Sequence, residues 1–291
     1  MIRLYLRSLY RLFKPLLFGR SQFKLFLNAT LGDINLRMLA LASSTDYFSS
    51  FVKPVVTTAP FGKSVVVIAP HQDDEAIGCG GALIQQLRAG GAAAVIMLQD
   101  GADGHEQLGI GRRELTELRN KESRQAAAAI GLESPVFLDH ARLEENISLA
   151  AEQVREIILR RKADALFVPF LLDGHVDHRT ASYIVAEALR EVPWNVRVLS
   201  YEVWGLCIPN VVLVIDDAMH DKVRMISCFT WANKAIDYVQ STRGLNMYHS
   251  KMLGAGECRY AERFFELPRK EYIELVERVR LAGQPAGAAR R

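Results

Sequence analysis

The chain has 291 residues, of which 49% are hydrophobic and 24% are charged, a composition typical of a globular protein with a substantial core. Its net charge of +3 is too small to indicate nucleic-acid binding. No uncharged apolar run reaches the ~18–20 residues that span a bilayer, and no clear cleavage site follows the basic N-terminus, so we expect neither a membrane span nor an export signal. The four cysteines include no C-x-x-C pair, which argues against a cysteine zinc site and a disulfide framework and favours reduced thiols in the cytoplasm.

The N-terminal segment differs from the rest of the chain in charge. Residues 1–30 carry six basic and no acidic side chains, so the remainder has a net charge of −3. Apolar and aromatic residues fill the other positions of this segment, which predicts one or two basic amphipathic helices. Three contacts remain open for them: an anionic membrane surface, a partner protein, or the body of the protein itself. The first would place the protein at the inner face of the membrane.

From residue 64 onward, predicted strands and helices alternate. The predicted strands are Val65–Ala69, Ala92–Leu98, Val136–Leu138, Ala165–Pro169, Val196–Trp204 and Val211–Ile215. The predicted helices are Gly81–Ala89, Arg112–Ile130 with Gly131 as its cap, Glu144–Lys162, Thr180–Glu191 and most of Asp217–Val239. This alternation predicts an α/β fold with a Rossmann-like, doubly wound and mostly parallel sheet.

The domain boundaries follow from the same pattern. We expect a helical extension and lead-in over residues 1–63, the main domain over 64–266, and a C-terminal helix and tail over 267–291. Within the main domain, we expect Gly244–Phe265 to wrap back over the sheet. Gly283–Arg291 is predicted to be a frayed tail.

The strand at residues 65–69 ends in a cluster of ligand-type side chains. Pro70 stops it, and His71, Asp73, Asp74 and Glu75 follow within five residues. Open α/β sheets bind their ligands at the carboxyl ends of strands. Because several buried carboxylates are costly unless a cation offsets them, this cluster favours a metal site.

A second cluster follows the strand at residues 165–169. It reads Gly174-His175-Val176-Asp177-His178. Parallel strands of one sheet point their carboxyl ends to the same edge, so the two clusters are expected to meet although they lie about 100 residues apart. The alternative interpretation is a pair of charged loops that cap helices and carry solvated histidines.

Three glycines, Gly78, Gly80 and Gly81, follow the first cluster. Their spacing is not that of a dinucleotide-binding loop, and the preceding acids would repel a phosphate. We therefore expect them to permit close packing of a helix on the sheet.

Both clusters resemble motifs of a known family. The sequences Pro70-His71-Gln72-Asp73-Asp74-Glu75 and Gly174-His175-Val176-Asp177-His178 are similar to the Ala-His-Pro-Asp-Asp-Glu and Gly-His-Pro-Asp-His motifs of the PIG-L/LmbE-like family of zinc-dependent N-acetylglucosaminyl deacetylases. Gln72 and Val176 replace the two prolines. The resemblance covers roughly residues 64–266, and further likenesses are Asp100-Gly101, Arg119, Glu122, Tyr201, Trp204 and Tyr260-Ala261-Glu262. The family's His-x-Ser-Gln stretch is replaced by Cys228-Phe229-Thr230-Trp231.

The resemblance implies a metal centre. It makes His71, Asp74 and His178 the ligands of Zn²⁺, and these three side chains leave room for water and for a substrate carbonyl. The same ligand set accepts other divalent metals such as Fe²⁺.

The resemblance also implies the catalytic and binding roles. Asp73 would take the proton from the attacking water and pass it to the leaving amine. His175 would donate a hydrogen bond to the oxyanion, and Asp177 would orient that imidazole. Arg119 and Asp100 are the candidate contacts to the substrate, and Glu75 would support the ligands.

These roles predict a metal-dependent hydrolase that removes the acetyl group from an N-acetylated amino sugar, either free, lipid-linked or in a glycoconjugate or polysaccharide precursor. Two alternatives remain open. The same chemistry could cleave another amide, such as that of a thiol–sugar conjugate, or the protein could be a membrane-docked, non-catalytic sugar-binding protein. The sequence does not determine the oligomeric state.

Overall fold

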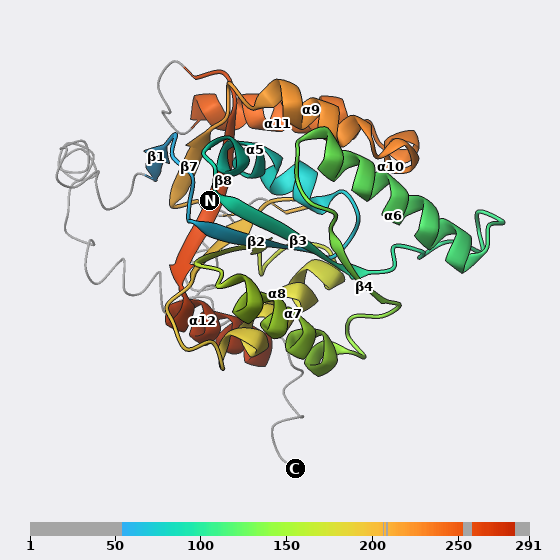
Figure 1. The fold of residues 1–291 in the computed structure, drawn as a ribbon, viewed down its shortest axis with the longest axis horizontal. Helices are drawn as coiled ribbons and strands as arrows, with labels where there is room; N and C mark the ends of the chain where they lie inside the picture. Colours follow the sequence, from blue (N-terminus) through green and yellow to red (C-terminus); the bar gives the residue numbers. More distant parts are fainter. Residues whose placement is uncertain (1–53, 206, 208, 253–257, 283–291) are drawn as a thin grey trace, which may run out of the picture. The chain divides into compact units, whose positions relative to one another are not determined.

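The computed structural model describes residues 54–205, 207, 209–252 and 258–282 (Figure 1). Within this part of the chain, eight strands form one sheet in the order β1-β7-β8-β6-β5-β2-β3-β4. The strands are β1 (Val55–Thr57), β2 (Ser64–Ala69), β3 (Ala92–Gln99), β4 (Val136–His140), β5 (Ala165–Pro169), β6 (Arg197–Tyr201), β7 (Val211–Val214) and β8 (Ala261–Pro268).

The sheet is doubly wound and mostly parallel. Strands β4, β3, β2, β5 and β6 are parallel to their neighbours, whereas β8 runs antiparallel between β6 and β7. The chain moves outward from β2 to β3 and β4, and then returns to β5 on the other side of β2. The predicted fold is confirmed, and the strand order reverses between β2 and β5, where such sheets leave a crevice for ligands.

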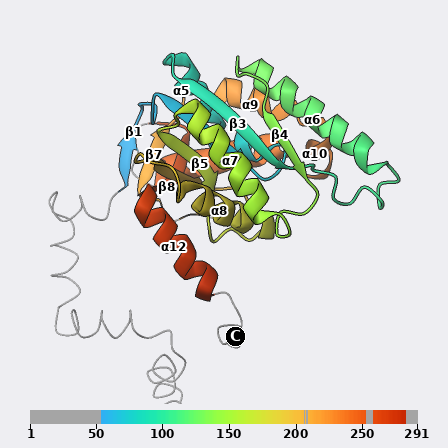
Figure 2. The same cartoon turned by 60° about the horizontal axis from the view of Figure 1, so that its bottom comes forward.

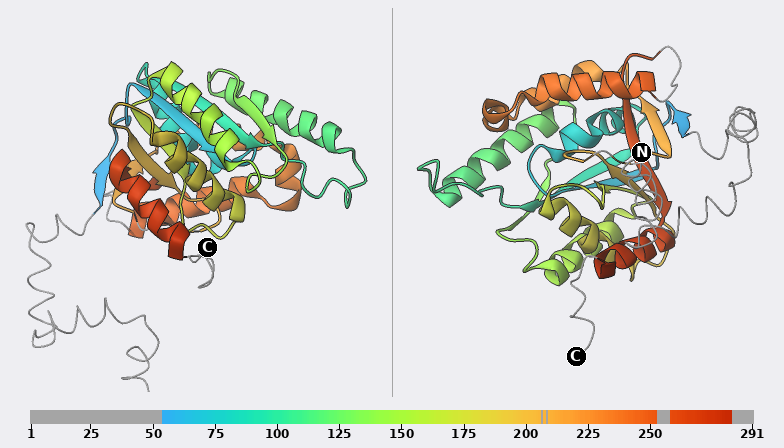
Figure 3. Two further views of the ribbon diagram at one scale, coloured as in Figure 1. Left: turned by 90° about the horizontal axis from the view of Figure 1, so that it is seen from below. Right: turned by 180° about the vertical axis from the view of Figure 1, so that it is seen from behind.

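Helices cover both faces of the sheet (Figures 1 and 2). One face carries α5 (Asp74–Arg88), α6 (Arg112–Ala129), α9 (Met219–Ser227), α10 (Thr230–Ala235) and α11 (Tyr238–Met252). The other face carries α7 (Ile147–Arg161), α8 (Val176–Leu189) and α12 (Arg269–Ala282), which Figure 3 shows from below and from behind. Because successive strand residues face opposite ways, Val65 and Val67 of β2 join one apolar cluster while Val66 and Ile68 join the other.

Two helices begin earlier than predicted. Helix α5 starts at Asp74, not at Gly81, and α8 starts at Val176, not at Thr180. The ligand-type residues therefore stand in the first helical turns, where acidic side chains interact favourably with the free N–H groups and the helix dipole. The sequence disguised this start because three glycines follow Asp74, and glycine is a weak helix former.

The C-terminal prediction needs a correction as well. In the described part of Gly244–Phe265, α11 continues to Met252, and β8 does not wrap over the sheet but lies inside it between β6 and β7. An antiparallel strand in an otherwise parallel sheet does not follow from the βα alternation that precedes it.

The predicted domain boundaries stay predictions. Strand β1 lies before the expected start at residue 64, and β8 extends two residues past the expected end at 266. The basic segment 1–30 and the tail 283–291 lie outside the described residues. Among the residues that the structure describes, no helix is both long and apolar enough to cross a membrane.

Helix α5 lies close to the sheet because it carries glycine. A Cβ placed on Gly78 would lie 2.1 Å from Cδ2 of Tyr201, whose ring is fully buried. The hydroxyl of Tyr201 donates to the carbonyl oxygen of Ile68 at 2.8 Å, so the ring cannot easily move aside. Gly78 therefore sets the distance between α5 and the strands that end at the candidate site.

A pair of helical glycines tests this packing. We expect Gly78→Ala to destabilise the protein by about 1–3 kcal/mol, because the methyl group overpacks against Tyr201. The matched control is Gly244→Ala, since Gly244 is exposed on α11 and an added Cβ would meet no atom within 4 Å. That change should be neutral or stabilise by up to about 1 kcal/mol. Denaturant unfolding measures both, and equal free energies for the two variants would contradict the account.

Candidate metal centre

The two predicted clusters meet at the carboxyl ends of β2 and β5. His71 follows β2, Asp74 is the first residue of α5, and His178 lies in the first turn of α8. His175 stands just before α8 as its N-cap residue. Residues about 100 positions apart are thus brought to the crevice where the strand order reverses.

Three atoms form a nearly equilateral triangle. Nδ1 of His71 lies 3.2 Å from Oδ2 of Asp74, Nε2 of His178 lies 3.3 Å from the same oxygen, and the two nitrogens are 3.4 Å apart. Tetrahedral ligands at zinc distances of 2.0–2.1 Å are separated by about 3.3–3.4 Å. The donor set and its spacing therefore fit a tetrahedral metal ion with one position left open.

His175 is the third imidazole of the cluster. Ring nitrogens of His71, His175 and His178 all lie within 4.8 Å of one another, so three histidines could also hold a metal. The His175 side chain, however, is 40% exposed, whereas that of His178 is fully buried. Nδ1 of His175 accepts the N–H of Asp177 at 3.2 Å, which leaves Nε2 as the nitrogen that carries the proton. The smaller triangle with Asp74 is therefore the better ligand set.

A carboxylate stands behind each of the two inner histidines. Oδ2 of Asp177 lies 3.3 Å from Nε2 of His71, and Oδ1 of Asp173 lies 3.4 Å from Nδ1 of His178. Such carboxylates fix the tautomer and orientation of metal-binding histidines. Asp177 was expected to orient His175, whose Nδ1 is 3.5 Å away, but it lies closer to His71.

Asp173 was not singled out from the sequence, although it directly precedes the second cluster. It is almost fully buried, and its carboxylate accepts the backbone N–H groups of His175, Trp204 and Gly205 at 2.8–3.0 Å. The signal that could have found it was its place, four residues after the end of β5 and within the loop that carries His175. Its hydrogen bonds join this loop to the loop after β6.

The charges of the cluster depend on one another. Burial lowers the pKa of His71, but hydrogen bonds to Asp177 and Asp74 outweigh it and raise that pKa to about 9. Burial also lowers the pKa of His178, but the carboxylates of Asp74 and Asp173 outweigh this effect and raise that pKa to about 10. Burial raises the pKa of Asp74, yet His178 and His71 hold it well below its usual range. A metal ion would take the place of the imidazole protons, so its binding releases protons.

Asp73 occupies a strained position beside the triangle. Its φ is 144° at the start of α5, a backbone conformation that residues other than glycine rarely adopt. Burial raises the pKa of its carboxyl group to about 7, although Arg119, whose Nη2 lies 3.6 Å away, works in the opposite direction. Its neighbour Glu75 is also buried, has its pKa raised to about 8 by burial, and accepts the N–H of Asp73 at 3.3 Å.

Arg119 reaches the site from α6. It donates to the carbonyl oxygens of Gly101 at 3.0 Å and Gln72 at 3.1 Å, and its side chain is only 17% exposed. Asp100, by contrast, is held in a two-point ion pair with Arg112, at 2.7 and 2.9 Å, and its Oδ1 also accepts the N–H of Ala102. This arrangement ties down the loop after β3, and a substrate contact of Asp100 stays a prediction.

A pocket of about 230 Å³ opens above the triangle. His71, Asp73, Asp74, Arg119 and His175 line it, together with Ile77, Asp103, Val203, Trp204 and Tyr238. Trp204 is 53% exposed, and its ring meets that of Tyr238 edge to face at 6.2 Å. Tyr238 was missed because it comes from α11, far along the chain, where no motif marks it.

Comparisons with known proteins bear on the same residues. The family model for PIG-L, described as GlcNAc-PI de-N-acetylase, matches residues 66–189, a range that contains both clusters. The matched residues are fewer than half of the chain. In the matched part of the chain, the two clusters follow β2 and β5, and α5 and α8 begin inside these clusters.

Two deacetylases and one hydratase also resemble the chain. A diacetylchitobiose deacetylase from Thermococcus kodakarensis is 28% identical over 131 residues, which are 44% of this chain and 49% of the relative. The chain thus matches about half the length of that curated relative. A solved N,N'-diacetylchitobiose deacetylase from Pyrococcus horikoshii has a TM-score of 0.62 at 22% identity, over 72% of this chain and 85% of that one. A 4-carboxy-2-hydroxymuconate hydratase, GalB, from Pseudomonas putida has a TM-score of 0.58 at 20% identity. The match covers 71% of this chain and 96% of the hydratase. These structures show a shared fold.

The structure accounts for Gln72, which replaces a proline of the PIG-L motif. Its fully buried side chain donates from Nε2 to the carbonyl oxygen of Gln99 at 3.2 Å and to Oδ1 of Asn120 at 2.8 Å. A Cβ on Gly101, whose φ is +66°, would lie 2.1 Å from Oε1 of Gln72. The amide therefore joins the ends of β2 and β3 to α6 and restricts the backbone next to Asp73, as a proline ring would.

The carboxylate behind His178 provides a test of the centre. We expect Asp173→Asn to weaken binding of Zn²⁺ by about 10–100-fold, because the imidazole loses the partner that fixes its orientation. The matched control is Asp103→Asn: Asp103 borders the pocket but contacts none of the three histidines, so affinity should stay within about twofold of the wild type. Competition with a chromogenic chelator measures both. An unchanged affinity in Asp173→Asn would contradict the proposed support of His178.

Proposed function

We propose that this protein is a metal-dependent hydrolase that removes the acetyl group from an N-acetylated amino sugar. The observation that carries the proposal is the ligand triangle of His71, Asp74 and His178, with the buried carboxyl group of Asp73 beside it in the same pocket. The PIG-L family match over residues 66–189 supports the same reaction.

The first part of the proposal concerns the metal. His71, Asp74 and His178 would hold a divalent ion, for which Zn²⁺ is the first candidate, and Fe²⁺ is accepted by the same donors. When bound, such an ion polarises a carbonyl oxygen and lowers the pKa of water to about 7. Asp177 and Asp173 would keep the two imidazoles in the orientation that binding requires.

Asp73 is the group that moves the proton. A carboxyl group with a pKa of about 7 is divided between its two protonation states near neutral pH. It can therefore accept the proton of the attacking water as a general base and return it to the leaving amine as a general acid. Arg119 keeps this pKa from rising further, and the strained backbone of Asp73 fixes where its carboxylate points.

His175 would stabilise the negative charge that develops on the amide oxygen. Its Nδ1 is occupied by the N–H of Asp177, so Nε2–H is the donor that remains. Burial and the neighbouring His71 and His178 lower the pKa of His175, so it enters the reaction as a neutral imidazole. A donor of this kind acts on the oxyanion more strongly than on the original carbonyl.

The substrate class follows from the pocket and from the relatives. Trp204 and Tyr238 give the pocket an aromatic surface, and Arg119 lines the same pocket. Aromatic faces with a few polar groups suit a sugar ring, which has both apolar and hydroxyl-bearing surfaces. The two deacetylases that resemble the chain are named for diacetylchitobiose, which supports an N-acetyl sugar.

One other reaction class is favoured by an observation of its own. The hydratase from Pseudomonas putida shares the fold, and adding water to a double bond also needs a positioned base. Acetate is a product of the proposed reaction alone, so its release separates the two. It also separates the proposal from cleavage of a different amide, which would release a different acid.

The decisive experiment compares the wild type with Asp73→Asn. The zinc-loaded wild type should release acetate from N-acetylglucosamine, N,N'-diacetylchitobiose or a related conjugate. Asp73→Asn should lower kcat by about 10²–10⁴-fold, because the amide cannot carry the proton. Metal content and melting temperature serve as controls, since Asp73 is not in the ligand triangle. Equal kcat in the two proteins, or no acetate from any N-acetyl sugar, would contradict the proposal.

A further inference from the structure

Two further pockets adjoin the candidate active pocket, and we call the three pockets together the trough. A pocket of about 340 Å³ shares Asp103 with the active pocket and also reaches Asp177. A third pocket, of about 370 Å³, shares Glu144 and Val176 with the second. We call the second pocket the middle section and the third the outer section of the trough. The three follow one another through shared lining residues.

The active pocket is too small to enclose a large substrate. At about 230 Å³ it is smaller than the ~300–1,000 Å³ of sites that enclose a whole drug-sized ligand. One ring with its acetamido group is therefore the part of a substrate that belongs there. Whatever the ring is attached to must leave the pocket, and the trough provides a path that begins at its edge.

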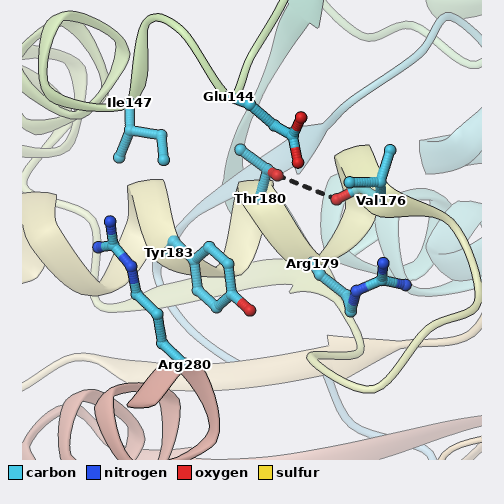
Figure 4. A pocket seen from close by; sticks show the side chains of 7 residues that line it. All are labelled: Glu144, Ile147, Val176, Arg179, Thr180, Tyr183 and Arg280. Atoms are coloured by element: carbon cyan, nitrogen blue, oxygen red, sulfur yellow. Dashed lines mark hydrogen bonds between the residues drawn. The ribbon is translucent and has the colours of Figure 1, made fainter. Parts of the chain in front are cut away.

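The outer section has the lining of a sugar site (Figure 4). The ring of Tyr183 stands at its centre, with the guanidinium carbon of Arg280 placed 5.3 Å from the ring centroid. Glu144 and Arg179 border it on the other side, and Ile147 adds an apolar surface. Hydroxyl groups both donate and accept, so a lining with a carboxylate and guanidinium groups suits them better than it suits an ion of one sign.

The charge of the middle section limits what can pass along it. Four carboxylates line it, those of Asp103, Glu144, Glu145 and Asp177. Two guanidinium groups offset part of this charge, that of Arg142 at 3.1 Å from Glu145 and that of Arg112 at 3.8 Å from Asp103. An anionic group such as a phosphodiester would be repelled there. Neutral or amino-bearing sugar residues would not be repelled by these carboxylates.

The trough and the reaction centre share a helix. Val176, which borders both the middle and the outer sections, lies two residues before His178 on α8, and Tyr183 lies seven residues after Val176. Seven residues of helix span about 10 Å, so the outer section lies well beyond the ring that reacts. The outer section is therefore positioned to bind a sugar residue further along the same oligosaccharide.

From this arrangement we propose that the trough binds the continuation of the substrate, so that the enzyme prefers an oligosaccharide of neutral or amino sugars over a monosaccharide or an anionic sugar conjugate. The inference rests on the proposed deacetylation and adds the substrate's length and charge. Tyr183 and Arg280 would contact a sugar residue in the outer section.

The test compares substrates of increasing length. Acetate release is measured with N-acetylglucosamine, N,N'-diacetylchitobiose, N,N',N''-triacetylchitotriose and, as an anionic conjugate, UDP-N-acetylglucosamine. We expect kcat/KM to rise at least tenfold from the monosaccharide to the trisaccharide and to be lowest for the anionic conjugate. Tyr183→Ala and Arg280→Ala should each lower kcat/KM for the trisaccharide about five- to tenfold through KM, and leave the monosaccharide unchanged.

A matched control is Arg278→Ala, because Arg278 is exposed on α12 but does not line the trough. It should leave all four substrates unaffected. Equal kcat/KM for the monosaccharide and the trisaccharide, with no effect of Tyr183→Ala or Arg280→Ala, would overturn the trough as a sugar site and leave the deacetylase proposal intact. If no substrate releases acetate while triacetylchitotriose binds, measured by calorimetry, and Arg280→Ala weakens that binding, the proposed reaction fails and the sugar site stands.

Discussion

The close approach of two imidazole nitrogens and one carboxylate oxygen is the constraint on which the site depends. Nδ1 of His71, Oδ2 of Asp74 and Nε2 of His178 lie 3.2–3.4 Å apart in a buried position. Bringing such groups together out of water is costly unless hydrogen bonds and compensating charges are supplied. The neighbouring carboxylates raise the pKa of both imidazoles, which favours their positively charged forms, and a divalent ion would supply positive charge in their place.

The surrounding structure holds these three groups in position. Asp173 and Asp177 fix the histidines from behind, and Gln72 joins the ends of β2 and β3 to α6. A second buried ion pair anchors α5 from the other side. The ammonium group of Lys222 donates to Glu262 at 2.6 Å and to the carbonyl oxygen of Ile77 at 2.8 Å.

Glu262 also accepts two N–H groups of α5, those of Gly81 at 2.7 Å and Ala82 at 2.9 Å. These bonds require a close approach at Gly81, where a Cβ would lie within 3 Å of both Glu262 and Ile215. The helix that carries Asp74 is therefore fixed by close packing and by hydrogen bonds from β8. Strain at Asp73, with its φ of 144°, persists because the backbone on both sides is held in this way.

Local patterns predicted much of this arrangement. The apolar run of β2 and the Pro70 that ends it predicted where the first cluster lies. The carboxyl ends of parallel strands lie at one edge of a sheet, which predicted that the two clusters meet. Interactions between distant residues could not be predicted. The antiparallel strand β8, the aromatic surface of Tyr238 and the role of Asp173 depend on which segments pack together, and no local periodicity encodes that packing. The start of α5 was missed because the helix dipole and buried partners outweigh the poor helix propensity of its three glycines.

The most direct measurement of the central claim is a crystal structure of the zinc-loaded protein, with anomalous diffraction recorded at the zinc edge. The account predicts one metal ion bonded at about 2.0–2.1 Å to Nδ1 of His71, Nε2 of His178 and Oδ2 of Asp74, with His175 unbonded. A metal ion held by the three histidines with Asp74 outside its ligands, or no anomalous peak at the carboxyl ends of β2 and β5, would contradict it.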